Sequence, residues 1–189
     1  DYEMEIGCFC SGAGTPNPND YVCLTHNNLQ IDNAFFWRDN TNELEVGMLD
    51  WGALCCGPLV CAIQGGCISG SQVEVYIEHR DAFIRAAVDS YEANGGPKLD
   101  VDRMRIMCNL QVALWACGDI RNVTSVLKDT KAAEWATITD WMDERLMKRF
   151  YVRAHCTQFK HSLQLWQKLD IYGEFKKWLA GLGLPETKG

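Results

Sequence analysis

The stretch HNNLQIDN at residues 26–33, followed by LDWG at residues 49–52, decides the fold of the first third of the chain. Two apolar runs lie between these stretches, at 33–37 and 43–49, and a short polar stretch separates the runs. Short apolar runs around a polar turn are typical of paired strands. The sequence therefore predicts a β-hairpin between a polar loop and a segment that carries Asp50.

Beyond residue 70 the spacing of apolar residues is helical, so the predicted fold class is mostly α with a small β-hairpin. Ser71 and Glu74 match a capping box at the start of a helix that ends with NGGP at 94–97. Residues 52–70 are rich in Gly and Cys, and they are expected to be irregular or to contain a short helix. The next helix is predicted from Asp100 to just before Gly118, followed by a connection or short helix at 122–128. Further helices are predicted over 130–138, 140–169 and 171–181. For the segment 140–169, the alternative is a break near His155.

The composition bounds the class of protein. The 189 residues are enough for one domain with a sizeable core, and 47% hydrophobic with 23% charged residues is typical of a globular chain. A net charge of -7 argues against nucleic-acid binding, which needs a basic face. The longest apolar run, at 53–63, is too short to cross a membrane. We therefore expect no nucleic-acid partner and no transmembrane segment.

The ten cysteines leave the redox compartment open. They include the neighbours Cys55 and Cys56, but no CxxC motif, so their spacing does not match a structural zinc site. We interpret most of them as small buried hydrophobic residues. The alternative is a secreted disulfide framework, in which the sequon at Asn122 would be glycosylated.

The chain divides into an arm, one lobe and a tail. Residues 1–21 are rich in Gly, Pro, Asn and Ser, so a flexible or loosely packed arm is expected there. The lobe is expected at 22–183, with its loop and hairpin in 22–58 and its helical part in 71–183. Residues 184–189 are expected to form the tail.

The order of loop, hairpin, acidic segment and helices resembles the C-terminal lobe of the aminoglycoside phosphotransferase and choline-kinase-like branch of the protein-kinase-like superfamily. His26 and Leu29 match the histidine and leucine of that family's catalytic loop. Asn33 and Asp50 match its two magnesium ligands. The resemblance implies a kinase-like helical domain, with magnesium and ATP as the cofactors of an active member.

The loop departs from the family at the position that matters most for catalysis. Asn28 stands where the family has its catalytic aspartate, and Asn27 and Gln30 replace a glycine and a second histidine. An amide cannot accept a proton near neutral pH, so general-base assistance, typically worth about 10²–10⁴ in rate, is lost. Asp32 is a candidate substitute. The degenerate loop, with His26, Asn28 and Asp32, therefore supplies no catalytic residue that can be assigned from sequence.

The family's nucleotide site is not matched either. The family places a β-rich lobe before the catalytic loop, with a phosphate-covering loop and a nucleotide-binding lysine. Here about two dozen residues precede His26, and the first lysine is Lys98. No ATP site contained within this chain is therefore expected.

These observations favour a catalytically inactive kinase-like lobe that acts as an accessory or scaffold subunit of a larger complex. Without an upstream lobe, an apolar face would be exposed, and such faces usually mark interfaces. The expected partners are other protein subunits, with peripheral association with a membrane complex as one setting. The interface candidates are Phe35, Phe36, Trp37 and Trp51.

Two other classes of function stay open. One is a small-molecule phosphotransferase, with Asn33 and Asp50 as its magnesium ligands, whose nucleotide-binding lobe is removed or supplied by another chain. The other is a module that binds an amphipathic or pigment-like ligand between its helices. A structural interpretation competes with the first, because His26, Asn33 and Asp50 are also suited to bracing the loop through hydrogen bonds.

The start of the sequence indicates the compartment only indirectly. It begins at Asp1 with no methionine and no secretory signal. This start is compatible with a trimmed protein imported into a plastid or mitochondrion, for example in a photosynthetic or respiratory complex. It is equally compatible with a truncated cytoplasmic protein.

Overall fold

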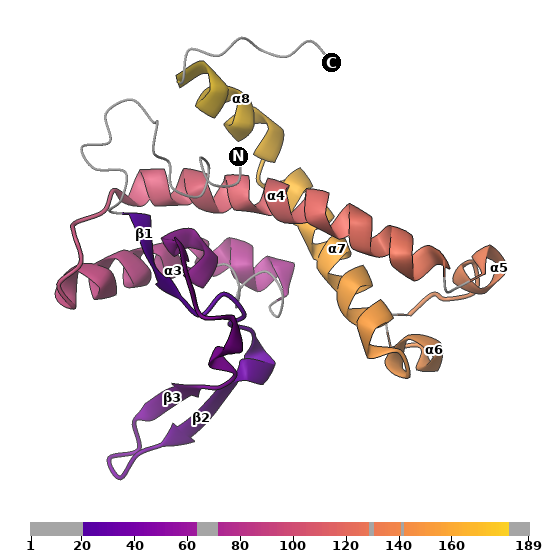
Figure 1. Cartoon of the computed structure of the whole chain (residues 1–189), viewed down its shortest axis with the longest axis horizontal. Helices are drawn as coiled ribbons and strands as arrows, with labels where there is room; N and C mark the ends of the chain where they lie inside the picture. Colours follow the sequence, from indigo (N-terminus) through magenta and orange to yellow (C-terminus); the bar gives the residue numbers. More distant parts are fainter. Residues whose placement is uncertain (1–20, 64–71, 129–130, 141, 182–189) are drawn as a thin grey trace.

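The computed structural model describes residues 21–63, 72–128, 131–140 and 142–181. The fold is mostly helical with a small β-hairpin, as predicted, and it has a second pair of antiparallel strands that was not predicted (Figure 1). The predicted tail and most of the predicted arm lie outside the described residues. Tyr21, assigned to the arm from sequence, belongs instead to the folded lobe, because its ring is buried and its hydroxyl accepts a hydrogen bond from the Asp100 amide at 3.3 Å.

The first strand pair joins β1 (Val22–Thr25) to β4 (Cys55–Pro58), in a register that places Val22 opposite Pro58 and Thr25 opposite Cys55. Between them the chain forms a short 3-10 helix η2 (Ile31–Asn33), the hairpin of β2 (Ala34–Arg38) and β3 (Leu44–Met48), and a second 3-10 helix η3 (Trp51–Ala53). In the hairpin Ala34 pairs with Met48 and Arg38 with Leu44. The predicted hairpin is therefore confirmed.

The turn of the hairpin is fixed by one carboxylate. Asp39 Oδ1 accepts hydrogen bonds from the Thr41 amide, the Thr41 hydroxyl and the Glu43 amide, at 2.8–2.9 Å. These bonds favour the charged carboxylate, so they hold the pKa of Asp39 below its usual value. Asn42 completes the turn at φ 68°, a left-handed conformation that asparagine tolerates better than most residues.

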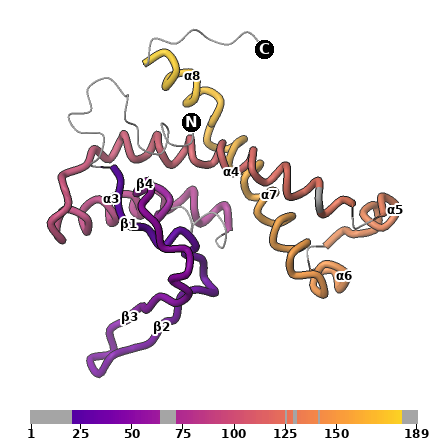
Figure 2. Tube along the Cα trace, viewed as in Figure 1, coloured from indigo at the N-terminus to yellow at the C-terminus, as the bar shows by residue number. Residues whose placement is uncertain are grey.

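Four long helices make up the rest of the lobe: α3 (Val73–Ala93), α4 (Val101–Lys128), α7 (Phe150–Lys168) and α8 (Ile171–Gly181). Two single-turn helices, α5 (Ala132–Trp135) and α6 (Glu144–Met147), join α4 to α7. Helix α4 is central, since α3, α7 and α8 all pack against it (Figure 2). The helix predicted at 171–181 is confirmed.

Three apolar clusters hold the helices together. The largest joins Tyr21 and Val60 to α3, α4 and α8, for example through Ile84, Leu110 and Leu179. A second lies between α3, α4 and α7, and a third lies under α5 and α6. None of the described residues of β2 and β3 belongs to a cluster, and Figure 1 shows this hairpin projecting away from the helices.

The prediction that the second helix stops before Gly118 is wrong, and residues 122–128, predicted as a connection or a short helix, are the last residues of that same helix. Helix α4 runs without interruption from Val101 to Lys128. A glycine inside a helix costs only about 1 kcal/mol relative to alanine. Burial of residues on both sides, including Val112 and Val126, offsets that cost.

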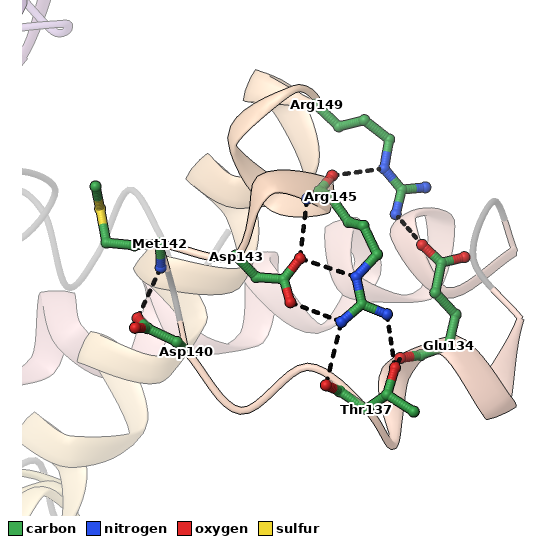
Figure 3. A network of polar contacts seen from close by, with 7 residues as sticks. All are labelled: Glu134, Thr137, Asp140, Met142, Asp143, Arg145 and Arg149. Carbon is green, nitrogen blue, oxygen red and sulfur yellow. Dashed lines mark hydrogen bonds and ion pairs between the residues drawn. The ribbon is translucent and has the colours of Figure 1, made fainter.

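The long helix predicted over 140–169 is in fact divided before Arg149. Asp143 Oδ1 accepts a hydrogen bond from the Arg145 amide and so caps α6, which is only four residues long. The Arg145 side chain also binds Asp143 and Thr137, while Arg149 bonds to Glu134 on α5 at 3.1 Å (Figure 3). Lys148 and Arg149 separate the two helices beside this polar network, and α7 begins only at Phe150.

Two other boundaries differ from the sequence prediction. The alternative break near His155 is wrong, because α7 continues through that residue and its ring lies edge-on to Tyr151, one turn earlier. The helix predicted over 130–138 is shorter in the structure, where only α5 (Ala132–Trp135) is helical among the described residues of this segment. The capping box at the start of α3 cannot be compared, since Ser71 lies outside the described residues; Gln72 is the residue before the helix, and its side chain does not cap.

Candidate functional site

The loop between β1 and β2 is tied to the segment after β3 by His26. This side chain is 5% exposed, and its Nε2 lies 2.6 Å from the carbonyl oxygen of Leu49. A carbonyl only accepts, so Nε2 carries the hydrogen and donates it. The imidazole also packs against the indole of Trp51, with ring centroids 4.7 Å apart. His26 therefore holds the loop in place against residues 49–51.

Asn33 forms the second tie. Its side chain is buried, and its Nδ2 donates to the backbone carbonyl of Asn28 at 2.7 Å. The backbone carbonyl oxygen of Asn33 accepts a hydrogen bond from the Leu49 amide at 2.8 Å. The structure thus brings His26, Asn33 and the residue before Asp50 together. The Asn33 side chain braces the turn through its nitrogen, whereas a metal ion would need its Oδ1.

Two residues of the site adopt left-handed backbone conformations. Asn27 has φ 56°, and Asp50 has φ 56° with ψ 59°. Asn and Asp are the residues besides glycine that enter this region most readily. Asparagine at position 27 and aspartate at position 50 are therefore suited to the turns in which they lie.

The carboxylates of the site point to solvent. Asp50 is exposed and precedes η3, but its side chain does not cap that helix. Asp32, the candidate substitute base, is also exposed. Among the three residues proposed as braces, the structure gives His26 and Asn33 that function and leaves the Asp50 carboxylate without it.

The donor set is sufficient for magnesium only together with other ligands. It offers one amide oxygen, from Asn33, and one carboxylate, from Asp50, and Mg²⁺ commonly takes one or two protein ligands besides phosphates and water. Within the part of the chain that the structure describes, no three His, Cys, Asp or Glu side chains gather into a metal site. Asn28 supplies only its backbone carbonyl to the brace, and its amide side chain cannot act as a base near neutral pH.

The four interface candidates lie exposed beside this loop. Phe35 and Trp37 stack on one face of the hairpin with ring centroids 5.2 Å apart, and Phe35 covers the face of Gly47, where any larger side chain would displace it. Phe36 lies on the other face. These three rings and Trp51 are 43–54% exposed.

The Phe36 face of the hairpin is hollowed into what we call the hairpin groove, a depression of about 290 Å³ with an almost wholly apolar lining. It continues from the candidate loop onto both strands. Its lining residues are Leu29, Gln30, Ile31, Ala34, Phe36, Val46 and Met48.

The cysteines do not form a site in the described residues. All seven that are described carry free thiols, and no disulfide joins them. The interpretation that most are buried is wrong for Cys55, Cys56 and Cys117, which are exposed. Cys23, on β1, has a pKa raised first by burial and then by the nearby Cys56.

One buried polar pair escaped the sequence analysis. Asp119 on α4 is 2% exposed and accepts a hydrogen bond from the Ser162 hydroxyl on α7 at 3.1 Å. Burial raises the pKa of Asp119 to about 6, and the bond from Ser162 offsets only part of that effect. The signal in the sequence was the position of Asp119, a single acidic residue directly after the apolar stretch LWACG. Because the predicted helix ended before Gly118, the prediction placed Asp119 outside the helix.

No helix in the described residues is long and apolar enough to cross a membrane. Comparison of this chain with family models, with curated proteins and with solved structures finds no match.

Proposed function

We propose that this chain is a catalytically inactive kinase-like lobe that acts as an accessory or scaffold subunit and binds another protein through its hairpin. One contrast carries the proposal. The side chains of His26 and Asn33, which the resemblance links to catalysis, hold backbone carbonyls of the loop, while the apolar rings of the hairpin beside them are exposed. Hydrogen bonds therefore stabilise the loop, whereas the hairpin leaves apolar surface that a partner can cover.

The physical argument concerns the stability of the hairpin. A two-stranded hairpin is at best marginally stable in water, and it gains stability by burying one face against another element. Here both faces carry large apolar side chains, with Phe35 and Trp37 on one and Phe36 and Val46 on the other. A protein partner that covers either face would remove this apolar surface from water, which favours association.

The charges around the hairpin indicate the kind of partner. Between residues 21 and 58 the acidic residues are Asp32, Asp39, Glu43, Glu45 and Asp50, whereas Arg38 is the single basic one. All of them are exposed. Complementary charges steer association and select partners. The expected partner therefore presents an apolar protrusion, of a size that fits the hairpin groove, with lysine or arginine around it.

The test is to purify the chain from its native source and to cross-link it within the complex. We expect a stoichiometric partner whose cross-links map to β2, β3 or Trp51. Phe36→Asp should abolish the complex, because it places a charge in the hairpin groove, and high salt should weaken it. Tyr172→Asp is the matched control, since Tyr172 is 57% exposed, against 54% for Phe36, and belongs to α8, which lies away from the hairpin (Figure 1).

A monomer in native extracts, or equal loss of the complex with Phe36→Asp and Tyr172→Asp, would contradict the proposal. The variants must first show unchanged helical circular dichroism. That control separates a lost interface from a misfolded lobe.

The alternative function, a magnesium- and ATP-dependent phosphotransferase completed by another chain, draws on a different observation. The Asp50 carboxylate is exposed and does not cap η3, so it is free of the structural role suggested for it. Calorimetry decides between the two functions. Magnesium-dependent ATP binding that disappears in Asp50→Ala would support the phosphotransferase, and absence of binding by the complete complex would rule it out.

A further inference from the structure

Helices α4 and α7 cross each other, as Figures 1 and 2 show, and a pocket of about 340 Å³ opens between them. This volume is at the lower end of the range of small-molecule sites in proteins. The pocket shares no residue with the hairpin groove or the candidate loop. Its lining residues are Leu114, Trp115, Gly118, Asp119, Arg121, Asn122 and Gln158.

The chemical centre of the pocket is the Asp119 carboxylate. It is 2% exposed and receives one hydrogen bond, from the wholly buried Ser162. Within the described residues no lysine, arginine or histidine forms an ion pair with it. A buried carboxylate with one neutral donor is poorly compensated, because burial of a charge is costly unless it is paired and hydrogen-bonded.

The surrounding side chains suit a cation with an apolar part. Trp115 is half-buried and presents an indole, the best aromatic partner for a cation. Asn122 and Gln158 bring amide oxygens that accept from N–H donors. Gly118 borders open space in the lining, since a Cβ added there would meet no atom within 4 Å.

We propose that this pocket binds a small organic ammonium ion, with the ammonium group against Asp119 and the apolar part against Trp115 and Leu114. A metal ion is disfavoured, because Asp119 is the single carboxylate among the described lining residues and Mg²⁺ or Ca²⁺ requires several oxygen ligands. Arg121 is exposed in the same lining, so its charge opposes any cation there and opposes ligands with two or more positive charges most strongly. The ligand class is therefore a monoamine rather than a polyamine.

The experiment compares two probes of the same shape. 2-Phenylethylamine carries the ammonium group, and 2-phenylethanol replaces it with a hydroxyl. Binding of each to the folded chain is measured by calorimetry and by ligand-observed NMR, with spermidine as the polyamine. We expect the amine to bind at least tenfold more tightly than the alcohol and than spermidine.

Two variants test the geometry. Asp119→Asn keeps a partner for the Ser162 hydroxyl but removes the charge, and it should weaken amine binding at least tenfold. Gly118→Leu should fill the pocket and abolish binding of both probes. Asp89→Asn on α3 is the control, because Asp89 is an exposed aspartate outside the pocket, and it should bind like the parent chain.

Equal affinity for the amine and the alcohol would overturn the proposal. So would retention of amine binding in Asp119→Asn, or the absence of amine binding at millimolar concentrations. Thermal unfolding of each variant confirms that the fold is intact. These outcomes leave the proposed docking function untouched, since that function depends on the hairpin.

Discussion

The imidazole of His26 and the backbone carbonyl of Leu49 are 23 residues apart in the chain and 2.6 Å apart in space. This hydrogen bond ties the start of the loop that contains the hairpin to the segment after β3, so together with the bonds of Asn33 and the β1–β4 pairing it fixes the position of β2 and β3. We expect His26→Ala to leave the Leu49 carbonyl without this donor and to lower the free energy of unfolding by about 1–3 kcal/mol. Unfolding in urea measures this change in free energy.

The control for that prediction is His79→Ala, because His79 lies on α3 with its side chain 51% exposed. Its substitution should change stability by less than about 0.5 kcal/mol. If the two alanine variants are equally stable, His26 does not brace the loop.

Asn33→Asp separates the bracing function of this residue from a metal-binding one. An ionised aspartate cannot donate to the Asn28 carbonyl, so the brace becomes a repulsive contact between two oxygens. We expect a loss of about 1–3 kcal/mol in urea unfolding and no gain in magnesium affinity. Unchanged stability together with tighter magnesium binding would favour the phosphotransferase alternative.

Asp119 should make the lobe less stable as the pH rises. Its pKa in the folded chain, about 6, lies above the ordinary value of 3.8, so the folded state binds the proton more tightly than the unfolded state. The stability that Asp119 contributes is present below about pH 4 and is lost as the pH rises through 6. We expect Asp119→Asn to recover about 1–3 kcal/mol at pH 7.

The measurement is the difference in unfolding free energy between the parent and Asp119→Asn, taken from pH 4 to pH 8. The difference is needed because Asp81 and Asp143 have pKa values lowered by Arg105 and Arg145, which gives them the opposite pH dependence. A difference that does not change with pH would show that burial does not perturb Asp119.

Gly118→Ala should stabilise the chain by about 0.5–1 kcal/mol, because it adds a methyl group in open space at the middle of α4. Gly173→Ala on α8 should not stabilise the chain. The new Cβ would meet the Asp170 carboxylate, which accepts a hydrogen bond from the Gly173 amide at 3.2 Å. Thermal unfolding of the two variants provides the comparison, and equal shifts would contradict this explanation.

The sequence was most informative where local patterns decide the structure. The apolar runs around Arg38-Asp39-Asn40-Thr41-Asn42 predicted the hairpin, and the last helix was predicted with its observed limits. His26 and Asn33 were also recognised from sequence as suited to bracing the loop, and the structure shows hydrogen bonds of that kind for both. These features follow from neighbours in the chain, which a sequence displays directly.

The misplaced elements depend on contacts between distant residues. Gly118 is a local stop signal, but the packing of Val112 and Val126 carries α4 through it. The division before α7 depends on Arg145 reaching back to Thr137 and on Arg149 reaching Glu134. The pairing of Asp119 with Ser162 likewise requires knowledge of how α4 and α7 cross.

The separation of the hairpin from the three apolar clusters has a consequence for local unfolding. Because β2 and β3 share no side chain with those clusters, the hairpin can open while α4 remains folded. Its backbone amides should therefore exchange with deuterium at a lower free-energy cost than those of α4, which exchange only when the whole lobe unfolds. A bound partner would then be detected as slowed exchange in β2 and β3, so the same amide protons report both the weakness of the hairpin and what covers it.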